Sequence, residues 1–153
     1  MSASIHDQRF NLAIPVKVGG RKIFEIYDYG PTTRKRAITF EHKEPETINW
    51  IDSFSPGDQL LDIGANIGVY SLYAASMGVR VVALEPEALN YALINLNIRL
   101  NKFNKTIMPY LVAAHNITKF STLNTRECVW GGALNSFDNA LDFMGNTYLP
   151  EHT

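Results

Sequence analysis

A glycine turn lies between two acidic residues near the middle of this 153-residue chain. In the stretch LLDIGANIGVYSLYAA, residues 60–75, Asp62 ends an apolar run and the turn Gly64-Ala65-Asn66-Ile67-Gly68 follows it. Glu85 ends the next apolar run. A carboxylate at such a strand end can accept two hydrogen bonds from the vicinal hydroxyls of a ribose. The pattern therefore predicts a site for an adenosine-containing ligand.

The order of residues in the turn favours one adenosine ligand over another. The turn reads G-x-N-x-G, whereas dinucleotide sites usually carry G-x-G-x-x-G. Asp62 would repel a pyrophosphate but would attract the ammonium and sulfonium charges of S-adenosylmethionine. An NAD-type ligand and a purely structural turn stay open as alternatives. Asp62 could instead cap loop amides, and Glu85 could instead be an acid favoured by a helix dipole.

The surrounding sequence predicts a parallel α/β sheet that positions this turn. Strands are expected over 59–64, 79–86 and 106–114, with helices over 67–77 and 87–101 between them. The continuous apolar run 81–84 predicts a strand covered on both faces. Pro109 places the third strand at a sheet edge, since proline donates no ladder hydrogen bond. The apolar face expected for the second helix carries Leu89, Ala92, Leu93, Leu96 and Leu100.

Residues outside this core are expected to form smaller elements. Gly19-Gly20 predicts a β-hairpin within 12–27, followed by a loop over 29–36 whose basic cluster, Arg34 to Arg36, is solvated. A short strand over 37–42 and a helix over 43–54, with Trp50 packed inside, would come next. Residues 119–125 could form a strand, and 126–132 a turn-rich loop. We expect two parts, 1–57 with the hairpin and lead-in helix, and 58–153 with a partial Rossmann-like, S-adenosylmethionine-binding domain.

Composition restricts the class of protein further. The chain is 46% hydrophobic and 19% charged, which is typical of a globular protein. Its net charge of −1 gives no overall positive electrostatic field that would attract nucleic acid. Cys128 is the one cysteine, and the four histidines are dispersed, so no metal site is expected. No apolar run reaches the length of a membrane span, and the N-terminus lacks the apolar core of a signal peptide. A soluble, cytoplasmic protein without nucleic-acid or membrane partners is expected.

Residues 60–75 and 81–101, with the lead-in 41–58, resemble the opening of the FkbM-type methyltransferases, and the resemblance covers roughly residues 40–114. It implies an α/β, Rossmann-like class I methyltransferase fold with S-adenosylmethionine as cofactor and a hydroxyl of a small molecule or sugar as methyl acceptor. In the implied site Glu85 holds the ribose hydroxyls and Pro86 shapes the turn beside the adenine. The loop that binds the cofactor is formed by Asp62, Gly64, Asn66 and Gly68. Tyr70 and Ser71 could line the helix start or serve packing alone.

The sequence departs from the family pattern after its third strand. The family's later strands, which position the acceptor, have no counterpart here, so we expect an incomplete parallel sheet preceded by a short N-terminal β-hairpin. This predicts a truncated chain, either inactive or completed by another copy or a complementing chain. The first strand would have an open edge unless residues 118–124 cover it. No catalytic base is nominated; His115 follows the third strand and could face the cleft. A catalytically silent adenosyl-binding or scaffold domain and an NAD-dependent oxidoreductase stay open as alternative functions.

Overall fold

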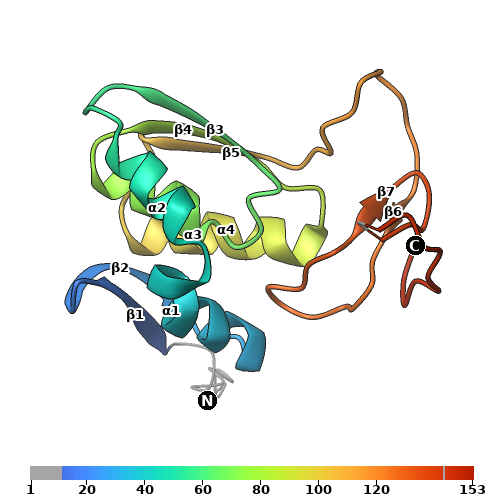
Figure 1. Cartoon of the computed structure of the whole chain (residues 1–153), viewed down its shortest axis with the longest axis horizontal. Coiled ribbons are helices and arrows are strands. Elements are labelled where there is room, and N and C mark those ends of the chain that lie inside the picture. The colour runs from blue at the N-terminus through green and yellow to red at the C-terminus, as the bar shows by residue number, and fades with distance from the viewer. Residues whose placement is uncertain (1–11, 143) are drawn as a thin grey trace, which may run out of the picture.

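The structure, a computed structural model, describes residues 12–142 and 144–153 (Figure 1). The part of the predicted N-terminal region that spans residues 1–11, including His6, lies outside the described residues. No helix in the described ranges is long and apolar enough to cross a membrane.

A three-stranded parallel sheet forms the centre of the fold. Its strands β3 (Gln59–Ile63), β4 (Arg80–Leu84) and β5 (Ile107–Tyr110) lie in the order β3-β4-β5. Helix α3 (Val69–Ser76) joins β3 to β4, and α4 (Ala88–Leu100) joins β4 to β5. Pro109 lies beside Ala83 in the edge strand β5, as predicted. The Rossmann-like α/β fold with an incomplete parallel sheet is confirmed.

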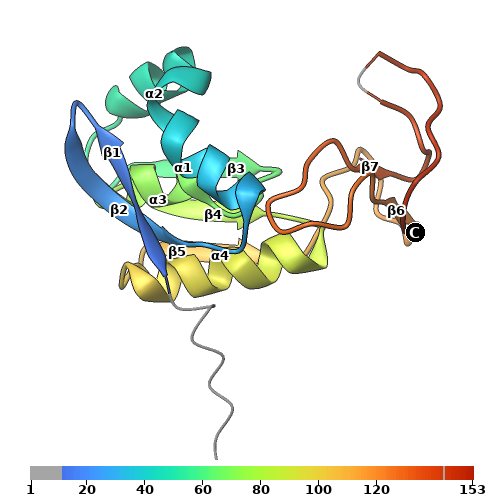
Figure 2. The ribbon, with the colours of Figure 1, turned by 90° about the horizontal axis from the view of Figure 1, so that it is seen from below.

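The sheet is covered on one face, and the expectation of cover on both faces is wrong. Figure 1 shows α3 and α4 on the same side of the strands, and the turned view in Figure 2 agrees. Side chains that point to this side are buried, among them Leu60 and Val81. Those on the opposite side, Leu61, Ile63 and Met108, are at least half exposed. The apolar run 81–84 therefore has one buried and one half-buried face.

The predicted N-terminal hairpin is confirmed, and hydrogen bonds from the helix α4 region hold it against the central sheet. Strands β1 (Ala13–Val18) and β2 (Arg21–Tyr27) pair antiparallel across Gly19-Gly20. Asn97 of α4 and Asn101, which caps the C-terminus of that helix, then bind the backbone of β2. Asn97 Oδ1 accepts from the Tyr27 amide, and Asn101 Oδ1 accepts from the Glu25 amide, both at 2.9 Å. These side chains satisfy backbone groups that would otherwise lie at an open strand edge.

The buried face of α4 differs from the predicted one. Its buried residues are Asn90, Leu93, Ile94, Asn97 and Ile98. Leu89, Leu96 and Leu100 are only partly buried, and Ala92 is exposed. The helix is rotated because Asn90 and Asn97 find backbone partners in the interior, which removes the usual cost of burying an amide.

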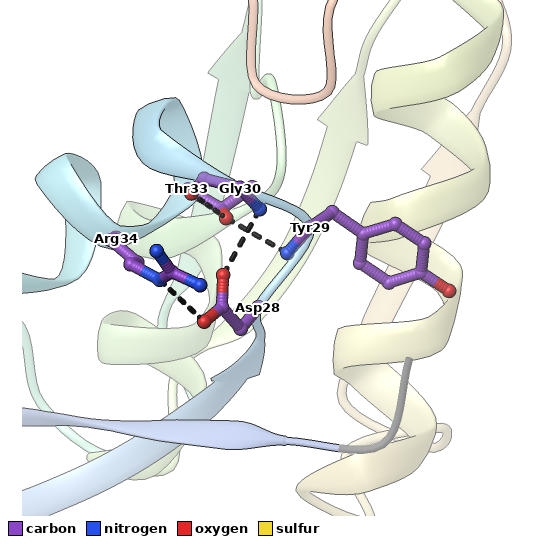
Figure 3. A network of polar contacts seen from close by, with 5 residues as sticks. All are labelled: Asp28, Tyr29, Gly30, Thr33 and Arg34. Carbon is purple, nitrogen blue, oxygen red and sulfur yellow. Dashed lines mark hydrogen bonds and ion pairs between the residues drawn. The ribbon is translucent and has the colours of Figure 1, made fainter. Parts of the chain in front are cut away.

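Helix α1 (Pro31–Lys43) replaces both the loop expected over 29–36 and the strand expected over 37–42. Figure 3 shows how its first turn is fixed. Asp28 accepts from the Gly30 amide at 3.0 Å and from Arg34 Nε at 2.6 Å. Thr33 Oγ1 accepts from the Tyr29 amide at 3.0 Å and donates to the Gly30 carbonyl at 2.9 Å. Pro31 at the first helical position completes the start, because its missing amide hydrogen is not needed there.

Helix α2 (Pro45–Asp52) confirms the predicted lead-in helix, but the position of Trp50 does not match the packing role expected for it. Trp50 is 54% exposed and rests edge-on against Phe54. Ile48 and Ile51 supply the buried face instead.

The C-terminal tail forms a short antiparallel pair of its own. Strand β6 (Leu123–Asn124) pairs with β7 (Ser136–Phe137), so the strand expected over 119–125 is shorter than predicted. Among the described residues β3 has only β4 as a strand neighbour. Residues 118–124 therefore leave the outer edge of β3 open.

Candidate functional site

The glycine turn after β3 alternates between ordinary and left-handed backbone. Gly64, Asn66 and Gly68 have φ angles of 77°, 54° and 85°. Glycine adopts this region without cost, and asparagine tolerates it better than most side chains. At Gly68 a Cβ would also meet the Ile94 side chain at 2.5 Å. The G-x-N-x-G pattern thus meets a backbone requirement of this turn.

All five amides of the turn are bound within the chain. The Gly64 and Ala65 amides donate to the Leu84 carbonyl at 2.8 and 3.0 Å, and the Gly68 amide donates to the Ala65 carbonyl at 2.8 Å. The Asn66 amide donates to Glu85 Oε2 at 2.7 Å. The Ile67 amide donates to Asn66 Oδ1 at 2.9 Å. The turn therefore offers no free backbone donors between 64 and 68.

Glu85 connects the turn to the start of α4. Its Oε1 accepts from the Glu87 amide at 2.9 Å, while Oε2 accepts from Asn66. The residue is 5% exposed. Burial raises the pKa of the Glu85 carboxyl, and the two backbone hydrogen bonds oppose that rise. Each carboxylate oxygen keeps a lone pair for a further donor, such as a ribose hydroxyl.

Asp62 lies in β3, next to its last residue, Ile63. Its Oδ2 accepts from Ser71 Oγ at 2.6 Å, and Ser71 is completely buried. Burial raises the pKa of the Asp62 carboxyl, against the lowering effect of the Ser71 hydrogen bonds. Burial also raises the pKa of the neighbouring Tyr70 phenol, and the charge of Glu44 adds to that effect.

Two cavities adjoin the turn, and Gly64 and Asn66 line both of them. We name the larger, of about 380 Å³, the turn cavity; Asp62, Tyr70 and Arg36 also line it. We name the smaller, of about 150 Å³, the Glu85 cavity; Pro86 and Asn90 contribute to it. Ligand pockets commonly measure about 300–1,000 Å³, so only the turn cavity has that size.

The Glu85 cavity is small because the tail folds over it. Gly132 and the residues to Asn135 form its outer wall. Asn90 holds this loop: its Oδ1 accepts from the Gly131 amide at 2.8 Å, and its Nδ2 donates to the Gly132 carbonyl at 3.0 Å. Asn66 Nδ2 donates to the same carbonyl. An adenosine bound against Glu85 would require this loop to move outward.

The structure brings Asp62, Gly64, Asn66, Glu85 and Pro86 together around these two cavities, whereas Gly68 packs against α4. His115 lies elsewhere, exposed and edge-on to the Phe137 ring. Within the described ranges no three His, Cys, Asp or Glu side chains are placed to hold a metal ion.

Sequence reasoning missed Arg36, Asn90 and the Gly131-Gly132 loop. The sequence places Arg36 in a solvated basic cluster because it does not predict helix α1. It places Asn90 in a helix and predicts no contact for its side chain. The pair Gly131-Gly132 is the sequence feature that could have indicated contact between the tail and the site, since paired glycines permit a close backbone approach.

No model of a known protein family matches the sequence, and no curated protein matches it. Among solved structures, the chain is similar to Trm5 of Methanocaldococcus jannaschii in complex with adenosine, with a TM-score of 0.45, 19% identity, and coverage of 65% of this chain and 29% of that one. It is similar to TYW2 of Pyrococcus horikoshii in complex with MeSAdo, with a TM-score of 0.45, 18% identity, and coverage of 66% and 36%. It is also similar to an S-adenosylmethionine-dependent methyltransferase from Agrobacterium tumefaciens, with a TM-score of 0.47, 16% identity, and coverage of 65% and 32%.

The chain spans about a third of the length of these solved structures. The chain has a Rossmann-like α/β fold, whose glycine turn and strand-end carboxylate lie where ligands bind in open parallel sheets.

Proposed function

We propose that the chain binds S-adenosylmethionine at the glycine turn and belongs to a methyltransferase. One observation carries the proposal: the five amides of the turn are used internally, while the carboxylates of Asp62 and Glu85 line the two cavities beside it. Such a site presents acceptors and negative charge. It suits a ligand with an ammonium, a sulfonium and two hydroxyl donors.

The same observation disfavours the NAD-type alternative. A pyrophosphate in a Rossmann-like fold is normally bound by free amides of the glycine turn and the following helix. Here the turn amides are occupied, and Asp62 would repel the phosphates.

In the proposed arrangement the methionine part occupies the turn cavity with its ammonium near Asp62. The ribose binds Glu85 once the Gly132 loop has moved, and Pro86 borders the adenine. Gly64, Asn66 and Gly68 shape the backbone between these parts. Residues 58–153 then form the cofactor domain, and 1–57 form the hairpin and lead-in region.

For the reaction we propose methyl transfer to a hydroxyl oxygen of a small-molecule or sugar acceptor, as the FkbM-type resemblance implies, in the cytoplasm. The chain would need to hold the acceptor oxygen in line with the methyl–sulfur bond. The open β3 edge and bare sheet face support completion of the site by a second copy or a complementing chain.

Calorimetric titration of the full chain with S-adenosylhomocysteine and with NAD tests the cofactor. We expect saturable binding of the first alone. Binding of NAD, or of neither ligand, would overturn the proposal. Transfer of a labelled methyl group from S-adenosylmethionine to small molecules of a cell extract then separates an active enzyme from a silent adenosyl-binding domain, which the one-sided sheet keeps as the second candidate.

A further inference from the structure

A third cavity, of about 410 Å³, lies between α1 and the tail, and we name it the basic cavity. Four cationic side chains line it: Lys35, Arg36, Lys43 and Arg126. Its one carboxylate is Glu127. The chain as a whole has a net charge of −1, so this concentration of positive charge is local.

Most of these cations lack an ionic partner. Lys43 pairs with Glu44 at 3.1 Å. For Lys35, Arg36 and Arg126, no carboxylate of the described residues lies within ion-pair distance. Arg126 lies over the Tyr148 ring, with its guanidinium carbon 5.5 Å from the ring centre.

Arg36 is held in place by the tail. Its Nε and Nη2 donate to the Gly131 carbonyl at 2.9 and 2.6 Å. Burial lowers the pKa of this guanidinium, and the negative charges of Glu85 and Glu44 offset that lowering only in part. A bound anion would supply the missing compensation.

The basic cavity adjoins the turn cavity, since Arg36, Lys43 and Ala133 line both. It does not include Asp62 or Gly64. A molecule that reaches from one cavity into the other would place its anionic end among the cations and its other end near the glycine turn.

We propose that the basic cavity binds an anionic oxygen group, a phosphate or a carboxylate, of the small-molecule methyl acceptor. This inference rests on the proposed methyl-transfer function. A small molecule is favoured over a nucleic acid because the cations gather in one cavity of a weakly acidic chain and do not form a long basic track.

Calorimetric titration of the full chain with inorganic phosphate, pyrophosphate and acetate tests whether the basic cavity binds anions. The variant is Lys35→Gln with Arg126→Gln, which removes two exposed charges and leaves Arg36 on the Gly131 loop. Arg99→Gln with Lys105→Gln is the matched control, because both residues are exposed and line none of the three cavities. We expect saturable binding of at least one anion, retained in the control and weakened about tenfold or more in the variant. Whichever of phosphate and acetate binds more tightly indicates whether the anionic group of the acceptor is a phosphate or a carboxylate.

Absence of saturable binding, or equal loss in the control, would overturn the inference. A parallel titration with S-adenosylhomocysteine separates the two possible sources of the anion. If the variant loses that ligand as well, the cavity holds the cofactor's own carboxylate and the acceptor assignment is wrong. If total tRNA binds instead and displaces phosphate, the small-molecule assignment is wrong. Failure of S-adenosylhomocysteine to bind the unmodified chain, with phosphate binding intact, overturns the proposed function while leaving the anion site measured.

Discussion

The backbone amide of Asn66 donates to Glu85 Oε2 at 2.7 Å, although the two residues are 19 positions apart in the sequence. This bond joins the turn after β3 to the end of β4. The carboxylate therefore supports the shape of the turn and also faces the Glu85 cavity. Substitutions at the two residues should separate these roles.

Glu85→Ala is expected to weaken S-adenosylhomocysteine binding by about 1.5–3 kcal/mol, because a charged hydrogen-bond acceptor for the ribose is lost. It should also lower the free energy of unfolding by about 1–3 kcal/mol for each buried amide left without a partner, at Asn66 and Glu87. Glu85→Gln keeps an acceptor oxygen and should retain more stability while still losing affinity. Calorimetry and denaturant unfolding measure the two effects. Unchanged affinity in both variants would remove Glu85 from the site.

The left-handed backbone at Asn66 leads to a second prediction. Asn66→Ala and Asn66→Gly both remove the side chain that accepts from Ile67 and donates to Gly132. Only alanine must also hold a φ of 54° with a Cβ, which costs about 1–2 kcal/mol. Asn66→Ala should therefore unfold at lower denaturant concentration than Asn66→Gly. Equal midpoints would show that the turn relaxes to another backbone conformation.

Asp62 predicts a dependence of stability on pH. Its pKa is raised by burial above the ordinary value of 3.8, so the folded chain binds its proton more tightly than the unfolded chain. The stabilisation that results from protonation of Asp62 is complete below the ordinary pKa of 3.8 and is lost as pH rises through the folded-state pKa. Unfolding curves between pH 3.5 and about 7 should show wild type losing stability relative to Asp62→Asn.

Ser71→Ala serves as the matched control for this effect. It removes the Ser71 Oγ hydrogen bond, which lowers the Asp62 pKa, and keeps the backbone hydrogen bond of residue 71, so the loss of stability with rising pH should be larger than in wild type. A wild-type curve parallel to that of Asp62→Asn over the whole range would contradict the prediction.

The sequence predicted the parts of the fold that depend on local pattern. Apolar runs ended by Gly64 and Glu85 define two strands, and the left-handed positions of the turn require Gly or Asn. The sequence pattern did not predict helix α1, because Thr32, Thr33 and Thr39 are β-branched and favour helix weakly. The buried face of this helix is also narrow. Only Pro31 after Gly30 indicated its start.

The wall of the site depends on contacts that no local pattern reports. Asn90 binds the Gly131-Gly132 loop across 41 and 42 positions of sequence. Arg36 reaches Gly131 across 95 positions. Both partners are backbone groups, so the residue types in the tail carried little information about them. The chain itself supplies the partners of the turn amides and the cover over Glu85, and neither is indicated by the sequence around the turn.

The one-sided sheet leads to the last prediction. Leu60 and Leu61 are neighbours in β3, but Leu60 is 5% exposed and Leu61 is 56% exposed. Leu60→Ala should lower the free energy of unfolding by about 2–5 kcal/mol, because it removes a packed side chain and leaves a cavity. Leu61→Ala should change it by less than about 0.5 kcal/mol. Equilibrium unfolding in denaturant measures both.

The comparison within this pair also tests what lies over the bare face in solution. If Leu61→Ala costs nearly as much as Leu60→Ala, the outer face of β3 is packed against protein. Repetition at several protein concentrations then identifies the cover. A cost at Leu61 that grows with concentration would mean a second copy of the chain, since association stabilises the folded state by mass action. A small cost at every concentration would mean that α3 and α4 alone support the sheet, as in the structure.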